Sequence, residues 1–433
     1  MSPTPYRWIR EYGCRMDSDL RSCLIRRLHV LRWIPCVLHR AAIRTLHHFR
    51  RIRVLVQLED GTLTASNHLE SALYKLNTPS PQYFNSIRTY SLKLSMDQLQ
   101  EVIELPGVKR VYLDRKVYAL LDTATKTTKA PIAWSKGNEG EGANIAVIDT
   151  GIHPHSDLTR PQNRIIAFKD FVKGKKSPYD DNGHGTHCAG DAAGNGFSSQ
   201  GKYRGPASKA SLIGVKVLGK TGSGNLSDVI SGIQWCIDHK DEYNIRVLSI
   251  SLGSQSHTSY RDDPIAQIVG QAWKQGIVVV AAAGNDGPDA GTISSPGIHP
   301  RIITVGATDD RKTPDLSDDR IASFSSRGPT TDGVIKPDIV APGSQVTSLR
   351  APGSYIDKMS YESRVDQHYS VMSGTSMATP IVAGIAAILL TEHPEWTPDQ
   401  VKRNLMKTAA DMGLDSQAQG SGQVQIRRSQ FTE

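Results

Sequence analysis

The sequence predicts an α/β protein with a doubly wound, mostly parallel sheet that has helices on both faces, preceded by a small α+β unit. Two observations predict the large sheet. From about residue 140, short apolar runs alternate with helical patterns, which is the order of strand–helix–strand units. These runs are continuous rather than alternating, as expected of strands covered on both faces. In such sheets, functional residues gather at the carboxyl ends of the strands.

The amino-terminal part divides into two predicted segments. Residues 1–50 are a basic leader that we expect to be helical in pieces, with a break at Pro35. Residues 51–121 are expected to form a separate α+β unit of the ferredoxin-like type, because strand and helix patterns alternate over a short length. The expected strands are 53–62, 86–94 and 108–114, and the expected helices, capped by Ser66 and Ser95, are 66–77 and 95–105.

A polar, threonine-rich stretch over 122–131 is predicted to be an exposed linker. The remaining residues, 132–433, are expected to form the large α/β domain. Its predicted strands are 144–149, 211–218, 246–253, 277–284 and 302–307, and its clearest helical patterns are 226–239 and 263–275.

The net charge of +8 is unevenly distributed along the chain. Residues 1–55 hold twelve arginines and three acidic residues, a balance of +9, so the other 378 residues sum to −1. A uniformly basic nucleic-acid-binding protein would not have this distribution, and we expect no nucleic-acid partner. The arginine-rich start also has the composition of a transit peptide or of an arm for an acidic partner. We favour a solvated arginine face on an amphipathic leader.

Membrane insertion and secretion are not expected from the sequence. The longest apolar run, Met377–Leu390, has 14 residues, short of the ~20 needed to cross a bilayer, so it predicts a buried core helix. Charged residues interrupt every apolar stretch of the first thirty positions, which argues against a secretory signal. The five cysteines are odd in number and fit free thiols in a reducing compartment. We therefore predict a cytoplasmic protein, with leaderless export left open.

Three short stretches each put a catalytic residue type among small residues. In "AVIDTG" (146–151), Asp149 closes a predicted buried strand, although an aspartate alone there is more typical of an Asx-turn. In "DDNGHGTHCAG" (180–190), glycines flank His184 and leave room for a close neighbour. In "GTSMATP" (374–380), Ser376 opens an apolar helix. There a serine can cap the helix, or it can act as a nucleophile beside unpaired N–H groups.

Together the three residue types have the chemistry of nucleophilic catalysis. A serine hydroxyl is a weak nucleophile at neutral pH and needs an adjacent base. Histidine, with an ordinary pKa near ~6.5, can take the proton and return it, and a buried aspartate fixes the imidazole tautomer. The chain order Asp149, His184, Ser376 is one of the arrangements that such triads adopt.

The motifs "AVIDTG", "NGHGTHCAG" and "GTSMATP" together resemble those of the subtilisin-like serine proteases, the subtilases, over roughly residues 130–415. The resemblance implies a subtilisin-like fold and a serine endopeptidase of broad specificity that acts on protein or peptide substrates. It implies Asp149, His184 and Ser376 as the catalytic triad. It also implies that Asn285, in "AAAGNDGP" (281–288), donates to the oxyanion, although its position alone equally suits a turn residue.

The resemblance further implies how substrate is held and how activity is restrained. The segments 220–225 and 251–254 resemble the two edges that pair with an extended peptide, with the predicted binding residues Ser223, Gly224, Ser251, Leu252 and Gly253. Residues 84–114 are similar to subtilase propeptides, which implies a self-processed zymogen inhibited by its own propeptide. The linker 122–131 is the expected place of self-cleavage. The absence of a signal and the free thiols resemble the leaderless, AprX-type branch of bacterial subtilases.

The sequence gives little indication of a metal or cofactor site. The chain has no H-E-x-x-H zinc motif, and we predict no catalytic metal and no required cofactor. Many subtilases hold structural calcium, yet the usual loop, here 194–207, lacks a convincing set of oxygen ligands. Asp170, Asp180 and Asp181 are candidates only by charge, so calcium ligands stay unassigned.

Two other functions are consistent with the same resemblance. A non-catalytic binding scaffold would need a broken triad or a blocked oxyanion hole, and the sequence has neither. A subtilase-fold acyl transferase or esterase would share the acyl-enzyme step and differ only in the group that attacks next.

Overall fold

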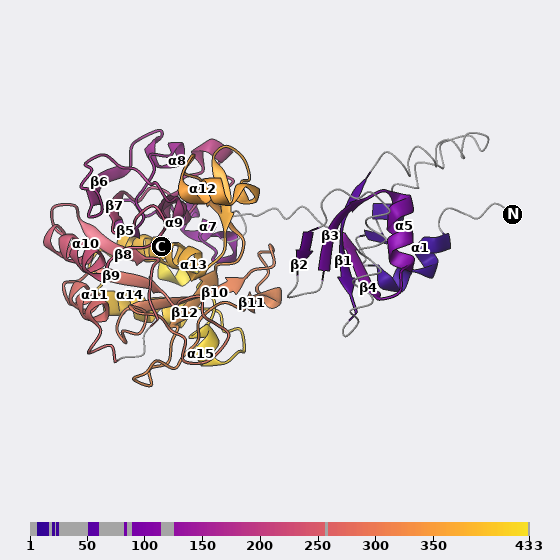
Figure 1. Cartoon of the computed structure of the whole chain (residues 1–433). Coiled ribbons are helices and arrows are strands. Elements are labelled where there is room, and N and C mark those ends of the chain that lie inside the picture. Colours follow the sequence, from indigo (N-terminus) through magenta and orange to yellow (C-terminus); the bar gives the residue numbers. More distant parts are fainter. Residues whose placement is uncertain are drawn as a thin grey trace. The chain divides into compact units, whose positions relative to one another are not determined.

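The computed structural model describes residues 7–16, 20–21, 23–25, 51–59, 82–84, 89–113, 125–255 and 259–431. The chain forms two compact units, Met1–Val117 and Tyr118–Glu433 (Figure 1). Each unit is described here by itself.

The first unit is built on a four-stranded antiparallel sheet in the order β2-β3-β1-β4. Its strands are β1 (Ile52–Leu58), β2 (Gln82–Phe84), β3 (Thr89–Leu94) and β4 (Val108–Leu113). Helix α5 (Met96–Glu104) begins at Ser95, whose hydroxyl accepts the N–H of Gln98 while the Gln98 side chain accepts the N–H of Ser95. The helix predicted at 66–77 lies outside the described residues.

The described pieces of the basic leader belong to this same unit. Helix α1 (Arg7–Glu11) and the 3-10 turn η1 (Gly13–Arg15) precede the sheet. Their apolar neighbours Trp8, Ile9, Met16, Leu20 and Leu24 are buried in one core with β1, β3, α5 and β4. The buried apolar residues and the exposed Arg10 and Arg21 fit the amphipathic leader that composition suggested. The boundary predicted at residue 50 differs, because these pieces share one core with the sheet.

The second unit is organised by an eight-stranded sheet. It consists of β5 (Asn144–Asp149), β6 (Ile165–Asp170), β7 (Leu212–Lys216), β8 (Ile245–Ile250), β9 (Val278–Ala282), β10 (Ile303–Asp309), β11 (Arg320–Ile321) and β12 (Ile339–Pro342). The order is β11-β10-β9-β8-β5-β7-β6, with β12 beside β10. Every pairing is parallel except that of β10 with β11, as the continuous apolar runs predicted.

Helices cover both faces of this sheet (Figure 1). Helices α9 (His184–Ala193) and α13 (Thr375–Glu392) pack together and onto the central strands, while α10 (Leu226–Asp238) and α11 (Pro264–Lys274) form the other packed pair. The remaining elements are α7 (Pro131–Ser135), α8 (Ser156–Thr159), η5 (Phe197–Ser199), η6 (Leu316–Asp318), β13 (Val346–Leu349), α12 (Tyr355–Met359), η7 (Tyr361–Ser363), β14 (Tyr369–Met372), α14 (Pro398–Thr408), α15 (Ser416–Gln419) and η8 (Arg428–Gln430).

Helix α13 is the central core helix of the second unit. By length and composition alone it is apolar enough to cross a membrane, but 83% of it is buried inside the protein. It contacts β5, β8, β9, β10 and β12 as well as α9. A helix that is apolar on all sides is expected in such a fully covered position.

The start of the second unit is docked rather than exposed. Thr125, Thr127 and Thr128 are at most 2% exposed. The hydroxyl of Thr125 donates to the carbonyl of Arg204 at 2.7 Å, and the N–H of Ile426 donates to the carbonyl of Thr128 at 2.8 Å. Over the described residues 125–131, the structure therefore differs from the exposed linker predicted for 122–131.

Candidate active site

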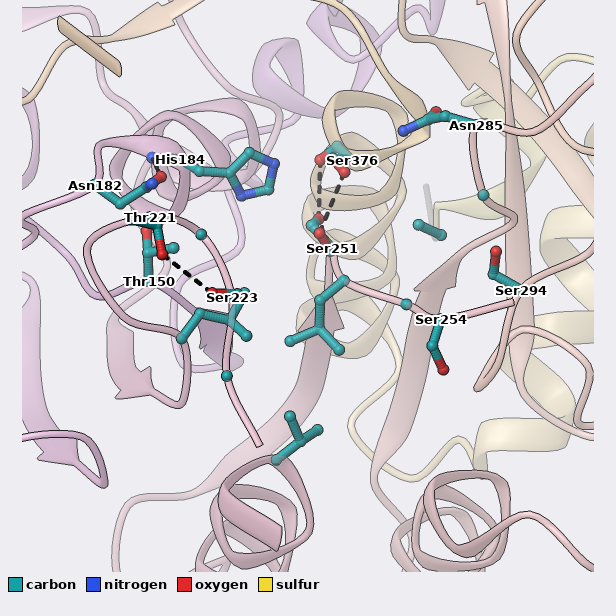
Figure 2. Close-up of a pocket in the computed structure, with 18 of the residues that line it drawn as sticks. Thr150, Asn182, His184, Thr221, Ser223, Ser251, Ser254, Asn285, Ser294 and Ser376 are labelled. Carbon is teal, nitrogen blue, oxygen red and sulfur yellow. Dashed lines mark hydrogen bonds between the residues drawn. The ribbon is translucent and has the colours of Figure 1, made fainter. Parts of the chain in front are cut away.

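A pocket of about 840 Å³ opens at the carboxyl ends of the parallel strands. Eight of the nine predicted site residues line it: His184, Ser223, Gly224, Ser251, Leu252, Gly253, Asn285 and Ser376. The ninth, Asp149, is completely buried behind His184. Figure 2 shows the imidazole of His184 and the side chain of Ser376 next to each other at one end of the pocket.

Asp149 and His184 form a directed pair. Asp149 is the last residue of β5, and its Oδ1 accepts the N–H of Thr150 at 2.7 Å. The same oxygen lies 2.8 Å from Nδ1 of His184. Burial lowers the pKa of His184, but the adjacent Asp149 carboxylate outweighs it and holds this pKa well above its usual range. The pair leaves Nε2 as the imidazole nitrogen available to the pocket.

Glycines bring His184 this close to the end of β5. Gly183, the N-cap of α9, has φ +108°, a left-handed conformation that favours glycine. At Gly185, an added Cβ would lie 2.3 Å from the carbonyl oxygen of Gly151 and 3.1 Å from Cβ of Asp149. The helix start and the strand end therefore touch at a point where no larger residue fits.

Ser376 lies in the first turn of α13, next to an interruption in the helix. Pro380 has no N–H, so the carbonyl of Ser376 loses its helical partner. Two side chains replace that bond: Oγ of Ser251 donates to this carbonyl at 2.9 Å, and Sγ of Cys188 donates to it at 3.4 Å. The proline thus explains why polar groups from α9 and from the residue after β8 converge on the Ser376 carbonyl.

The hydroxyl of Ser376 is bonded to a backbone group in this structure. Its Oγ donates to the carbonyl of Ser251 at 3.2 Å (Figure 2). Among the described residues no hydrogen bond joins it to His184. The structure thus brings the serine and the histidine into one pocket, with the serine hydroxyl turned toward Ser251.

Asn285 follows the end of β9 and faces Ser376 with its amide nitrogen. Its Oδ1 accepts the N–H of Thr375 at 2.9 Å and the hydroxyl of Thr375 at 3.1 Å. These two bonds fix which end of the amide is the oxygen, and Figure 2 shows the nitrogen turned toward Ser376. A donor aimed at the space beside a serine hydroxyl suits an oxygen that gains negative charge.

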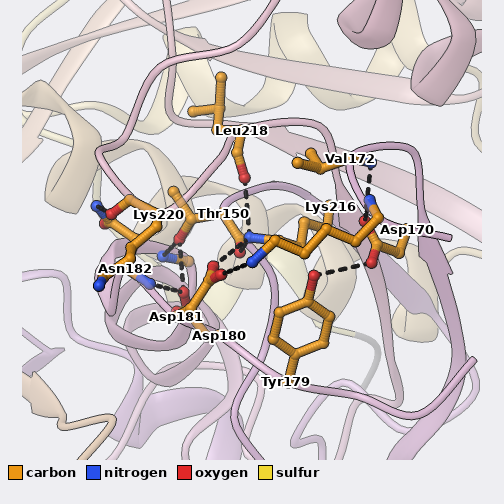
Figure 3. A network of polar contacts seen from close by, with 12 residues as sticks. Thr150, Asp170, Val172, Tyr179, Asp180, Asp181, Asn182, Lys216, Leu218 and Lys220 are labelled. Carbon is orange, nitrogen blue, oxygen red and sulfur yellow. Dashed lines mark hydrogen bonds and ion pairs between the residues drawn. The ribbon is translucent and has the colours of Figure 1, made fainter. Parts of the chain in front are cut away.

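A buried lysine beneath the pocket was not predicted from the sequence. Lys216, the last residue of β7, is 0% exposed. Its ammonium donates to the carbonyl of Thr150 at 2.5 Å, to Oδ1 of Asp181 at 2.8 Å and to the carbonyl of Leu218 at 2.9 Å (Figure 3). The ammonium of Lys216 thus links three segments around the pocket. They are the turn after β5 at Thr150, the loop before His184 at Asp181, and the pocket lining at Leu218.

The aspartates considered for calcium by charge have other partners. Asp180 accepts the N–H groups of Asn182, Gly183 and Thr186 and the hydroxyls of Thr150 and Thr186. Asp181 binds Lys216 and Lys173, and Asp170 accepts the hydroxyl of Tyr179 at 2.8 Å (Figure 3). These carboxylates shape the loop that carries His184, and their donor-rich surroundings do not fit a calcium ion.

One further wall of the pocket comes from the segment that contains α12. Tyr355 and Ile356 line the pocket, and their N–H groups donate to the carbonyls of Asp181 and Asn182, both at 2.9 Å. No motif marks this short helix in the sequence, and its contacts span more than 170 positions. It could not have been assigned to the site before the fold was known.

Asp149, His184 and Cys188 offer ligand atoms within 4.8 Å of one another. Burial raises the pKa of the Cys188 thiol to about 11, so the thiol is neutral at neutral pH. The imidazole nitrogen facing this group already bonds to Asp149. The chemistry of this trio therefore suits proton transfer better than metal binding.

The site combines a buried aspartate that contacts a histidine, a serine in the first turn of a helix, and an amide nitrogen that faces this serine. On a doubly wound α/β fold, this combination defines a serine hydrolase site. A model of the Subtilase family matches residues 140–422. The chain belongs to this family, and it is a serine protease.

The chain is similar to known proteases over different shares of its length. The chain is 44% identical to "Serine protease AprX" of Bacillus subtilis (strain 168), covering 97% of both chains. It is 38% identical to "Subtilisin Savinase" of Lederbergia lenta, over 68% of this chain and 93% of that protein. Among solved structures, "Sphericase" is 35% identical with a TM-score of 0.54, covering 67% of this chain and 93% of that one.

Proposed function

We propose that this protein is a broad-specificity serine endopeptidase whose catalytic triad is Asp149, His184 and Ser376. The observation that carries the proposal is the 2.8 Å contact between Asp149 and Nδ1 of His184, formed behind the pocket that His184 and Ser376 line. The pair fixes the tautomer in which Nε2 can accept a proton.

In the proposed reaction, Oγ of Ser376 exchanges its bond to the Ser251 carbonyl for one to Nε2 of His184. The histidine takes the hydroxyl proton as Oγ attacks the scissile carbonyl carbon, and Asp149 stabilises the imidazolium that forms. Asn285 Nδ2 and the first-turn N–H of Ser376 donate to the oxyanion. The imidazolium then protonates the leaving amine, and water hydrolyses the acyl-enzyme by the same steps.

We propose that substrate lies as an extended strand between the segments 223–224 and 251–253. The support is that Ser223, Gly224, Ser251, Leu252 and Gly253 all line the pocket. Backbone groups on such edges bind the main chain of any peptide, which gives affinity with little sequence choice. Small neighbours, including Gly222 and Gly284, leave the rest of the pocket open.

We propose that the protein is made as a self-processed zymogen and that its own amino-terminal unit is the inhibitor. Support comes from the compactness of that unit, which has its own core. Because residues 125–128 are docked into the second unit, the proposed cut lies before Thr125. The reaction needs no cofactor, and we propose that the protein acts in the cytoplasm, consistent with four free cysteines among the described residues.

One experiment tests the reaction type. The purified protein is treated with a serine-directed fluorophosphonate and, separately, with an unlabelled peptide library. We expect labelling at Ser376 and hydrolysed peptides. Labelling with ligated products would instead identify an acyl transferase, and no labelling at Ser376 would contradict the triad.

A second experiment tests self-processing. Intact mass is measured for the wild-type protein and for Ser376→Ala, each purified alone. We expect the wild type to lose its leader with a new end at or before Thr125, and Ser376→Ala to stay full length. A processed Ser376→Ala chain would mean that another protease removes the leader.

A further inference from the structure

Helix α12 is fastened to the loop that carries His184. Its first two N–H groups donate to the carbonyls of residues 181 and 182, both at 2.9 Å. The next residue of the loop is equally close, because a Cβ added at Gly183 would lie 2.7 Å from Oγ of Ser354 and 3.8 Å from Cβ of Ile356. The start of α12 therefore lies directly against the three residues that precede His184.

A buried carboxylate holds the rest of α12 in place. Asp357 is 6% exposed. Its oxygens accept N–H groups from Arg350, Gly353 and Arg364 at distances of 2.5 to 3.1 Å. Burial alone would raise the pKa of Asp357, but these donors outweigh it and lower the pKa to about 2. Charge-assisted bonds of this kind fix geometry, so α12 is a rigid wall of the pocket.

The polar side chains at this end of the pocket already have partners. Figure 2 shows Thr150 and Asn182 next to His184. Oδ1 of Asn182 accepts the N–H of His184 at 3.1 Å, and its Nδ2 donates to the carbonyl of Lys220 at 2.8 Å. The hydroxyl of Thr150 donates to Asp180 at 3.0 Å and accepts the N–H of the residue after His184 at 2.9 Å. Both side chains are therefore engaged in holding the loop.

The surface that this end of the pocket offers to a substrate is apolar. Leu218 lines the pocket, and its N–H donates to the carbonyl of Asp149 at 3.2 Å, which places it beside the pair of Asp149 and His184. Tyr355 and Ile356 line the same pocket and are half-buried. An apolar side chain gains free energy when such a surface takes it out of water. A charged side chain would lose its hydration there and find no partner in exchange.

We propose that α12 gives this protease one selective position: the substrate side chain that lies between His184 and Ile356 is apolar, and Ile356 selects it. This inference rests on the proposed triad and on the proposed extended binding of substrate. Backbone pairing along 223–224 and 251–253 binds any peptide main chain, so it leaves most positions unselected. A rigid apolar wall discriminates at the single position that faces it.

The test compares the purified active protein with two variants on one mixed peptide library, at about 0.15 M salt, with the cleaved bonds mapped by mass spectrometry. In the wild type we expect apolar residues to be enriched at one position relative to the cleaved bond. Ile356→Ala should lower the ratio of kcat/KM for leucine over alanine at that position by about 10-fold. Ile356→Glu should give a preference for lysine and arginine at the same position, because a carboxylate then faces the substrate side chain.

Met359→Glu is the matched control for Ile356→Glu. Met359 lies on the same helix, is 66% exposed and does not line the pocket. Its variant should cleave as the wild type does, because salt screens an exposed charge over ~8 Å.

Three results would overturn the inference. The first is an unchanged profile in both Ile356 variants. The second is an equal loss of cleavage for all peptides, which would mean that α12 only supports the loop before His184. The third is no cleavage by the wild type, which would overturn the proposed function as well.

Discussion

Ser251 and Ser376 exchange two hydrogen bonds. Oγ of Ser251 donates to the carbonyl of Ser376 at 2.9 Å, and Oγ of Ser376 donates to the carbonyl of Ser251 at 3.2 Å. The first bond holds the helix start that carries the nucleophile, where Pro380 has removed the usual donor. The second is the bond that the proposed reaction must break.

Ser251→Ala should therefore destabilise the start of α13. The carbonyl of Ser376 would keep only the weak thiol donor of Cys188, and a buried acceptor left poorly satisfied costs about 1–3 kcal/mol. Urea unfolding of the Ser376→Ala chain, with and without Ser251→Ala, measures this loss in the free energy of unfolding. The matched control is Ser249→Ala, two residues earlier in β8, because the buried Ser249 hydroxyl has no partner among the described residues. Equal losses from both changes would contradict the role given to Ser251.

Asn285→Ala should lower kcat by about 10²–10³-fold and leave KM close to wild type, because the amide is proposed to bind only the developing oxyanion. Steady-state kinetics on a peptide substrate separate the two constants. Asn225→Ala is the control: Asn225 lines the same pocket but donates to Asp228 at 2.9 Å. A change confined to KM in Asn285→Ala would assign Asn285 to substrate binding instead.

Asp149→Asn should reduce kcat by about 10⁴-fold, because an amide at this position favours the wrong imidazole tautomer. The residual activity should extend to lower pH. The Asp149 carboxylate holds the pKa of His184 up, and the proposed base must be neutral, so removing the carboxylate moves the acid limb of the pH–rate profile downward.

Asp191→Asn is the matched control for Asp149→Asn. Asp191 contacts Nδ1 of His187 at 2.9 Å, in a pair that is fully buried and does not line the pocket. This change should alter stability while the folded protein keeps its acid limb. An unmoved acid limb in Asp149→Asn would indicate that another group controls it.

Lys216→Met should cost about 3–5 kcal/mol of the free energy of unfolding, because it leaves two carbonyls and the Asp181 carboxylate without their buried cation. Lys173→Met is the control, since Lys173 pairs with the same Asp181 at 2.7 Å but is half exposed. We expect Lys173→Met to leave stability close to wild type. Urea unfolding in the Ser376→Ala background compares the two, and similar losses would refute the importance of burial.

The sequence was sufficient where one short segment carried the whole signal. The continuous apolar runs predicted β5, β7, β8, β9 and β10. The short motifs around His184 and Ser376, and the family resemblance that they carry, predicted the residues that line the pocket. Ser95 was enough to locate the start of α5. In each case the deciding interactions lie within a few residues.

What the sequence missed depends on contacts between distant segments. β6 is an edge strand in which only the first and last residues are buried, and β12 has only four residues, so neither gives a continuous buried apolar run. Nothing local predicts that Lys216 is buried or that Tyr355 reaches the pocket. Likewise, a threonine-rich stretch has the composition of a linker, and only the distant Arg204 and Ile426 reveal its docking.

The docking of residues 125–128 ties the beginning of the protease unit to its end. Besides the contact of Ile426 with Thr128, the side chain of Gln425 donates to the carbonyl of Thr127 at 2.6 Å. A circularly permuted protease unit, with position 125 joined to the carboxyl terminus by a short glycine bridge and new ends opened in a surface turn, should consequently keep its native architecture. Fraying of either natural end would loosen the other, so heat inactivation should start at this junction.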